Sequence, residues 1–226
     1  MSVIRFDHVS HGYGDRPVLR DIDLEITEHR VGIVGSNGSG KSTLARMING
    51  LVSPSSGTVT VDGLNVARKG GQVRRKVGFV FTDPDNQIVM PTVAEDLAFS
   101  LRRTGASKDE VADRVADMLD RFGLAGHADH PAHLLSGGQK QMLAIGAVLI
   151  RRPDVLVADE PTTLLDLRNS RKVGAVFDTL EQQVVVVTHH LDLLTNFDRV
   201  IVIHDARVAH DGRPADALPA YEALLE

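Results

Sequence analysis

The segment GSNGSGKST at residues 35–43 constrains this chain more than any other feature. It fits the pattern G-x-x-x-x-G-K-[ST], follows the apolar run VGIV at 31–34 and precedes helix-forming residues at 43–51. Glycines let successive backbone N–H groups turn toward a polyphosphate, and the start of the helix adds the positive end of its dipole. We therefore expect a strand, a phosphate-binding loop and a helix in direct succession. The candidate contacts are Gly35, Ser36, Asn37, Gly38, Ser39, Gly40, Lys41, Ser42 and Thr43.

Short apolar runs alternate with helical periods along the rest of the chain, which is typical of an α/β core around a mostly parallel sheet. We expect one domain over residues 1–226, with an ATPase-type core formed by 1–82 and 151–226 and an inserted helical subdomain at about 83–150. Strands are predicted at 3–9, 19–26, 31–34, 58–63, 77–81, 155–159, 184–188, 199–203 and 207–209. Helices are predicted at 43–51, from the Thr92–Glu95 capping box onward, and at 111–122, 139–150, 167–181 and 214–225.

Two of the predicted buried strands end in polar residues that suit phosphate chemistry. VLVADEP at 155–161 ends in Asp159 and Glu160, and VVVVTHH at 184–190 leads into His189. A carboxylate at the end of a strand beside a phosphate loop is where a Mg²⁺-linked acid and a general base are expected. Lys41 would supply a charge to the β- and γ-phosphates, and Ser42 an oxygen for Mg²⁺.

Together with LSGGQ at 135–139, these segments resemble, in order and over essentially the whole chain, the ATP-binding-cassette (ABC) ATPases. The resemblance implies a nucleotide-binding domain with a P-loop (RecA-like) core, N-terminal antiparallel strands and an inserted helical subdomain. It implies ATP and Mg²⁺ as ligands, with Ser42 and Asp159 holding the metal. It also implies Glu160 as the base that deprotonates the attacking water, with Lys41 and His189 at the γ-phosphate.

The same resemblance implies that each chain carries two half-sites. Tyr13 looks like the aromatic residue that stacks on adenine, and Asp166 like the D-loop aspartate. Ser136, Gly137, Gly138 and Gln139 belong to the signature, which in the family faces the γ-phosphate of ATP held by the other subunit. The expected partner is therefore a second ABC ATPase chain, most simply an identical one.

Thr82, His190 and the pair Leu164-Leu165 depart from the commoner family pattern. Thr82 stands where a glutamine usually follows the strand, and its hydroxyl could still reach Mg²⁺ through water. Gln87 lies five residues farther on and is expected to face a membrane partner rather than the site. His190 replaces a common aspartate and is expected to be a solvated loop residue. Leu164-Leu165 replaces the commoner Ser-Ala or Gly-Leu.

The stretch FTDPDNQIVMPTVAEDLAF at 81–99 resembles one subgroup, the ATPases of energy-coupling-factor (ECF) transporters. These import vitamins and transition metals by driving a membrane scaffold protein and a small substrate-binding membrane protein. Within the subgroup the chain looks most like the ATPases of biotin transporters, with cobalt or nickel transporters as the alternative. The resemblance implies a peripheral protein on the cytoplasmic face of the cell membrane.

Two other classes of function share these motifs. Soluble ABC ATPases that act on DNA carry long heptad insertions, and those that act on the ribosome usually carry two cassettes; neither feature is present. The net charge of −5 also disfavours a nucleic acid partner. A regulator that switches without turnover is disfavoured by the presence of Glu160 and His189. No apolar run approaches the roughly 20 residues that span a bilayer.

Three clusters invite other interpretations. His127, His130 and His133 are evenly spaced, but Pro131 interrupts any helix that would align them, so we expect a solvated loop. The basic run 74–76 is expected to be an exposed edge or loop. Glu95-Asp96 is explained by helix capping rather than by paired catalytic carboxylates.

Overall fold

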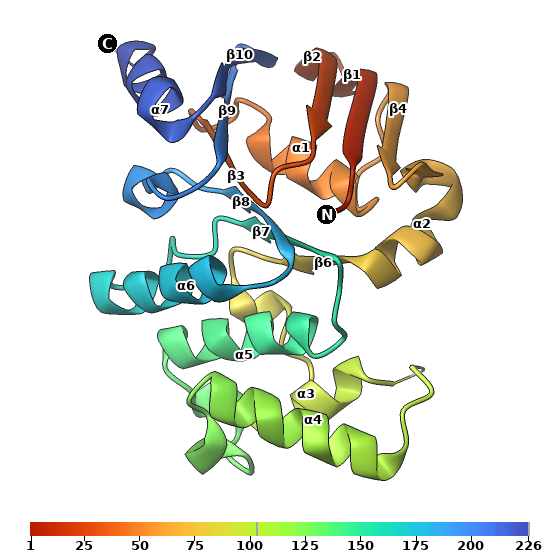
Figure 1. Ribbon diagram of the computed structural model, residues 1–226, viewed down its shortest axis with the longest axis vertical. Helices are drawn as coiled ribbons and strands as arrows, with labels where there is room; N and C mark the ends of the chain where they lie inside the picture. The colour runs from red at the N-terminus through yellow and green to blue at the C-terminus, as the bar shows by residue number, and fades with distance from the viewer. Residues whose placement is uncertain (103, 226) are drawn as a thin grey trace.

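The computed structural model describes residues 1–102 and 104–225, and its strands form two sheets (Figure 1). The smaller sheet is antiparallel, with the order β2-β1-β4-β5. The larger sheet has the order β10-β9-β3-β8-β7-β6, in which only β10 is antiparallel to its neighbour. The strands are β1 (Ile4–Tyr13), β2 (Arg16–Ile26), β3 (Arg30–Gly35), β4 (Ser56–Val61), β5 (Leu64–Asn65), β6 (Val77–Val80), β7 (Val155–Asp159), β8 (Gln183–Val187), β9 (Arg199–His204) and β10 (Arg207–Gly212).

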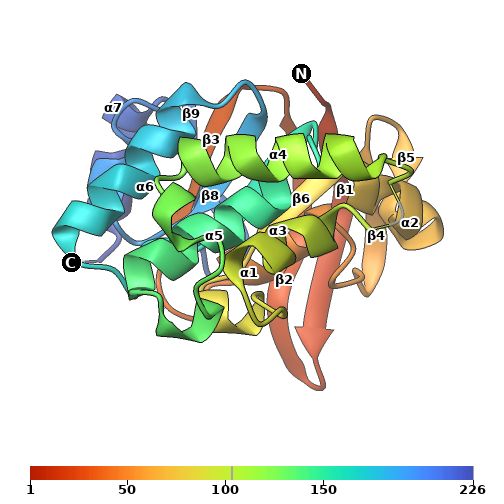
Figure 2. The same cartoon turned by 90° about the horizontal axis from the view of Figure 1, so that it is seen from below.

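Helices cover both faces of the larger sheet. In Figure 1, α1 lies between the two sheets, and α5 packs below α6 with α3 and α4 beyond it; Figure 2 shows α3, α4 and α5 stacked as one helical layer. No helix within residues 1–102 and 104–225 is long and apolar enough to cross a membrane. The helices are α1 (Lys41–Ile48), α2 (Val66–Lys76), α3 (Val93–Ser100), α4 (Lys108–Arg121), α5 (Gly137–Leu149), α6 (Leu167–Thr179) and α7 (Pro214–Ala223).

The central strands are apolar on both faces because each face covers a different core. On β8, Val185 and Val187 pack in the cluster formed with α1 and the antiparallel sheet, whereas Val184 and Val186 pack in the cluster formed with the helical layer. All four side chains are fully buried. This two-sided burial removes the alternation of polar and apolar residues, and it confirms the expected α/β architecture with N-terminal antiparallel strands.

The prediction that residues 74–76 form an exposed edge or loop is wrong, because they are the last turn of α2. The sequence pattern hides this helix. Only Val66 and Val73 are buried, two glycines lie in its middle, and Lys69 departs from helical backbone angles. The division into a core of 1–82 and 151–226 and a subdomain of 83–150 stays a proposal.

Candidate active site

The phosphate loop joins β3 to α1, as the sequence predicts. Gly38 and Gly40 have φ angles of 81° and 106°, in the left-handed region that glycine adopts without a steric penalty. A Cβ on Gly40 would lie 2.5 Å from the carbonyl oxygen of Val18 in β2. The antiparallel sheet therefore fixes the shape of the loop. Lys41 is buried, and its Nζ donates to the carbonyl of Ser36 at 3.4 Å inside the same loop.

The three residues with expected catalytic roles meet at the carboxyl ends of the parallel strands. Lys41 Nζ lies 3.8 Å from Glu160 Oε1, and His189 Nδ1 lies 2.7 Å from Glu160 Oε2. Thr163 Oγ1 also donates to Oε2, at 3.1 Å. Burial, together with the charge of Glu160, raises the pKa of the Tyr221 hydroxyl in α7. The Glu160 carboxylate is therefore held between a cation, an imidazole and a hydroxyl.

The two residues with expected metal-binding roles are in direct contact. Ser42 Oγ donates to Asp159 Oδ1 at 2.7 Å, and Arg46 donates through Nη2 to Asp159 Oδ2 at 2.9 Å. The Asp159 carboxylate is 1% exposed, so both of its oxygens have protein partners in place of water. A hydroxyl beside a carboxylate is a hard-oxygen donor pair, which fits Mg²⁺.

Arg46 was not among the residues singled out from the sequence. A signal was present, because Ser42 and Arg46 are four residues apart on α1 and so lie on one face of the helix. Once Ser42 is assigned to Asp159, the same face places a guanidinium beside that carboxylate.

The signature residues form the start of α5. Ser136 is the N-cap, and it exchanges hydrogen bonds with Gln139 in a capping box. Gly138 is packed closely, since a Cβ there would lie 2.4 Å from Cγ of Asn169 in α6. Among the described residues, no hydrogen bond or ion pair joins the signature to the phosphate loop.

The other two expected nucleotide contacts lie at exposed positions. Tyr13, at the end of β1, is 57% exposed, and the ring of His11 meets it edge-on with a centroid distance of 4.8 Å. Asp166 is the N-cap of α6, where its Oδ1 accepts from the backbone N–H of Asn169 at 2.8 Å. Tyr13 thus presents an accessible aromatic face, and Asp166 has a local structural role as well.

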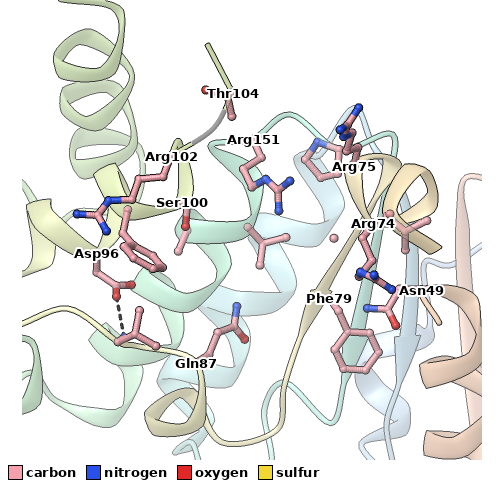
Figure 3. A pocket seen from close by; sticks show the side chains of 18 residues that line it. Asn49, Arg74, Arg75, Phe79, Gln87, Asp96, Ser100, Arg102, Thr104 and Arg151 are labelled. Carbon is pink, nitrogen blue, oxygen red and sulfur yellow. Dashed lines mark hydrogen bonds between the residues drawn. The ribbon is translucent and has the colours of Figure 1, made fainter. Parts of the chain in front are cut away.

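A groove with a cavity volume of about 1130 Å³ runs between α2 and β6 on one side and α3 and α5 on the other (Figure 3). Gln87, on the loop between β6 and α3, points toward it. Asp96 is buried beneath the groove and accepts from the backbone N–H groups of Val89 and Met90. These hydrogen bonds fasten the loop between β6 and α3 to α3. Four exposed arginines line the opening: Arg74, Arg75, Arg102 and Arg151.

Thr82 and Gln87 each have defined hydrogen-bond partners. Thr82 Oγ1 donates to the backbone carbonyl of Asp159 at 2.9 Å. Gln87 accepts from Phe81 N and donates to the carbonyl of Ala144 in α5. Its amide thus braces the loop against the helical layer, and the prediction that it faces a partner remains untested.

Two histidines expected to be solvated are half-buried instead. His190 Nδ1 lies 2.9 Å from Thr162 Oγ1, so the loop after β8 is tied to the loop after β7. His127 Nε2 lies 3.1 Å from Nε2 of the signature Gln139. Neither contact is visible in sequence spacing, because each pairs residues from different loops. By contrast, the capping role expected for Glu95 is confirmed by the complete Thr92–Glu95 capping box.

Comparisons with known proteins agree with this geometry. A family profile described as ABC transporter matches residues 19–163. A Deinococcus radiodurans protein, named only as an ABC transporter ATP-binding protein, is 53% identical over 99% of both chains. The biotin transport ATP-binding protein BioM of Rhizobium etli is 43% identical over 98% of both. The energy-coupling factor transporter ATP-binding protein EcfA1 of Enterococcus faecalis is 38% identical over 99% of this chain and 84% of its own.

Two solved structures share the fold. CbiO1 of Clostridium perfringens, described as part of the ABC transporter complex cbiONQ, superposes with a TM-score of 0.85 at 33% identity. The match covers 98% of this chain and 92% of that one. A dimeric ATP-binding cassette in a post-hydrolysis state, bound to ADP and Pi, superposes with a TM-score of 0.82 at 30% identity, over 93% of this chain and 98% of that one.

Proposed function

Since this chain belongs to the family of ABC transporter ATP-binding proteins and is an ATPase that binds ATP, we propose that it powers an importer of the energy-coupling-factor type. The observation that carries the ATPase role is the meeting of Lys41, Glu160 and His189 beside the Ser42–Asp159 pair, and the relatives named for energy-coupling-factor and biotin transport support the importer. The favoured cargo is biotin, because relatives named for biotin transport align over nearly the whole chain.

The proposed chemistry follows from the positions of these side chains. Backbone N–H groups of residues 36–43 and Lys41 bind the phosphates of ATP, and Tyr13 stacks on the adenine. Glu160 accepts a proton from the water that attacks the γ-phosphorus, and the bond to the ADP oxygen breaks as the new P–O bond forms. His189 holds the Glu160 carboxylate and faces the γ-phosphate.

Ser42 and Asp159 would hold Mg²⁺, because they place a hydroxyl and a carboxylate oxygen within hydrogen-bond distance of each other. The metal, when bound with ATP, neutralises charge that develops on the phosphates. Arg46 stays at the other oxygen of Asp159 and keeps the carboxylate oriented.

We further propose that two copies of the chain complete each site. The signature lies at the N-terminus of α5, where backbone N–H groups can bind the γ-phosphate held by a second copy. Asp166 lies on the same side, since its neighbour Asn169 touches Gly138. Exposed leucines flank this surface: Leu134, Leu164 and Leu167. The dimeric state of the ADP-bound cassette described above supports this arrangement.

The groove beside Gln87 is the proposed docking place for the helices of a membrane scaffold protein, which in turn would hold a small substrate-binding membrane protein (Figure 3). The size of the groove and the fastening of its loop to α3 and α5 support a partner-binding role. The chain would then lie on the cytoplasmic face of the cell membrane and would contact its partners rather than the cargo.

The test combines turnover with partner capture. Replacing Glu160→Gln keeps the shape of the side chain and removes the base, so ATP turnover should fall by roughly 10²–10⁴-fold. The matched control is Glu222→Gln, an exposed glutamate on α7 that should turn over at the wild-type rate. Wild-type turnover by the Glu160→Gln protein would refute the role of Glu160.

The Glu160→Gln chain should also accumulate as ATP-bound dimers. For partner capture, this variant is given an affinity tag and is purified in detergent from its native cells. Recovery of a helical membrane scaffold with a small multi-span protein supports the importer. The small protein is then assayed for binding of biotin, cobalt and nickel. Recovery of ribosomes, DNA or no membrane protein refutes the transport role and leaves the ATPase activity intact.

A further inference from the structure

The backbone at the proposed catalytic base is in an unusual conformation. Glu160 has a φ angle of 52°, in the left-handed region that non-glycine residues rarely adopt. Such a conformation persists only where surrounding contacts hold it, and it is found most often at functional sites. The contacts that hold Glu160 therefore bear directly on where its carboxylate points.

The peptide unit that joins Asp159 to Glu160 is fixed from both sides. Its carbonyl oxygen, which belongs to Asp159, accepts the hydroxyl hydrogen of Thr82 at 2.9 Å. Its N–H group, which belongs to Glu160, donates to the carbonyl of Val187 at 2.8 Å. Thr82 follows β6 and Val187 ends β8, and these strands flank β7. The plane of this peptide is thus clamped between the two neighbouring strands.

Rotation of that plane changes the backbone angle that aims the Glu160 side chain. The carboxylate has to lie 2.7 Å from His189 Nδ1 and 3.8 Å from Lys41 Nζ at the same time. Small displacements of a catalytic group from its productive geometry reduce rates strongly, by up to about 10²-fold for 1 Å. Loss of a hydrogen bond that holds this peptide plane should therefore lower the rate of ATP turnover.

We propose that Thr82 is a positioning residue for ATP hydrolysis, which aims Glu160 by holding the carbonyl of Asp159. The inference rests on the proposed role of Glu160. The Thr82 hydroxyl has one hydrogen, and this hydrogen is donated to the carbonyl, so the side chain acts through the backbone of β7. The expected contact with a Mg²⁺-bound water would use the lone pairs of the same hydroxyl oxygen, so it stays a separate prediction that the Mg²⁺ requirement of the variants tests.

Three variants of the full chain separate the hydroxyl from the rest of the side chain. Thr82→Val keeps the shape and removes the donor, whereas Thr82→Ser keeps the donor and removes a methyl group. The matched control is Thr179→Val, because the Thr179 hydroxyl also donates to backbone carbonyls, on the exposed C-terminal turn of α6. For each variant, kcat, the KM for ATP, the half-saturating Mg²⁺ concentration and the thermal midpoint are measured.

We expect Thr82→Val to lower kcat about 3- to 10-fold, the range that loss of one hydrogen bond allows. Its KM and its half-saturating Mg²⁺ concentration should stay at the wild-type values, and its thermal midpoint should fall by only about 2–4 °C because the Asp159 carbonyl loses its donor. Thr82→Ser and Thr179→Val should match wild type in kcat, KM and Mg²⁺ requirement. An unchanged kcat in Thr82→Val overturns the proposal. Equal losses in the Val and Ser variants also overturn it, as does a raised Mg²⁺ requirement with kcat preserved at saturation.

Glu160→Gln is measured in the same series. Wild-type turnover by Glu160→Gln would refute the role of Glu160 as the general base in the proposed function. Collapse of turnover in Glu160→Gln with no change in Thr82→Val refutes only the inference about Thr82.

Discussion

Gly40 in the phosphate loop packs directly against the backbone of β2, so Gly40→Ala should damage both the fold and nucleotide binding. Gly40 is the N-cap of α1 with φ at 106°. The new Cβ would lie 2.5 Å from the carbonyl oxygen of Val18 and 2.8 Å from Cδ2 of Leu19. Leu19 can turn, but the Val18 carbonyl belongs to the backbone of β2 and cannot move away without disturbing that strand.

The magnitude follows from three contributions. Left-handed backbone costs a non-glycine residue about 1–2 kcal/mol, and forced overlap in a packed region costs about 1–3 kcal/mol. Alanine also lowers the conformational entropy of the unfolded chain, which stabilises the folded state by about 0.4–1 kcal/mol. We expect Gly40→Ala to lose about 2–3 kcal/mol of unfolding free energy.

The matched control is Gly63→Ala. Gly63 also has a positive φ, at 73°, but a Cβ there would meet nothing within 4 Å. It carries the backbone cost without the overlap, so its loss should be about 1 kcal/mol or less. The difference between the two variants, about 2 kcal/mol, isolates the contact between the loop and β2.

Urea titrations followed by far-ultraviolet circular dichroism suit this chain, because it has no tryptophan to report unfolding. Binding of a fluorescent ATP analogue is measured on the folded proteins, and Gly40→Ala should bind at least about tenfold more weakly than Gly63→Ala because the loop must shift. If the two variants lose the same unfolding free energy, or bind the analogue equally well, the steric argument is refuted.

Two further predictions concern charged pairs. Arg46→Met should lower the unfolding free energy by about 1–3 kcal/mol in urea without nucleotide, because the buried Asp159 carboxylate loses one of its two partners; a loss below about 0.5 kcal/mol contradicts this. Burial alone would raise the pKa of Asp62, but hydrogen bonds from Lys76 and Val3 N hold it below its usual value of about 3.8. The stability that Asp62 contributes is therefore present above pH 3.8 and is lost as the pH falls through its folded-state pKa. Asp62→Asn should be less stable than wild type at pH 7, and its unfolding free energy from urea titrations should fall less steeply as the pH is lowered. Equal slopes in the two proteins at acid pH would contradict the assignment.

The parts of the site that could be predicted from the sequence are those encoded locally. The spacing of glycines between a buried strand and a helix predicts the phosphate loop. Asp159, Glu160 and His189 can be predicted as site residues because they follow runs of apolar strand residues. Since the carboxyl ends of parallel strands meet at one edge, these separate signals converge on one place, where the structure brings Lys41, Glu160 and His189 together.

The parts that escaped prediction depend on contacts between distant segments. Helix α2 was missed because its two glycines and basic residues give it almost no apolar stripe, and it is held by the burial of Val66 and Val73. The sequence predicts solvated positions for His127 and His190 because their partners, Gln139 and Thr162, lie in other segments. No local pattern records such pairs.

Thr82 illustrates why a departure from a family pattern is hard to interpret from sequence. Read locally, it is a shorter side chain in a place where a longer one could reach a metal. In the fold, the same position follows β6 and lies beside the end of β7, one strand away from the carbonyl that sets the backbone of Glu160. The short Thr82 side chain can reach the Asp159 carbonyl. Its effect on the site depends on the positive φ angle of Glu160, which no sequence pattern predicts.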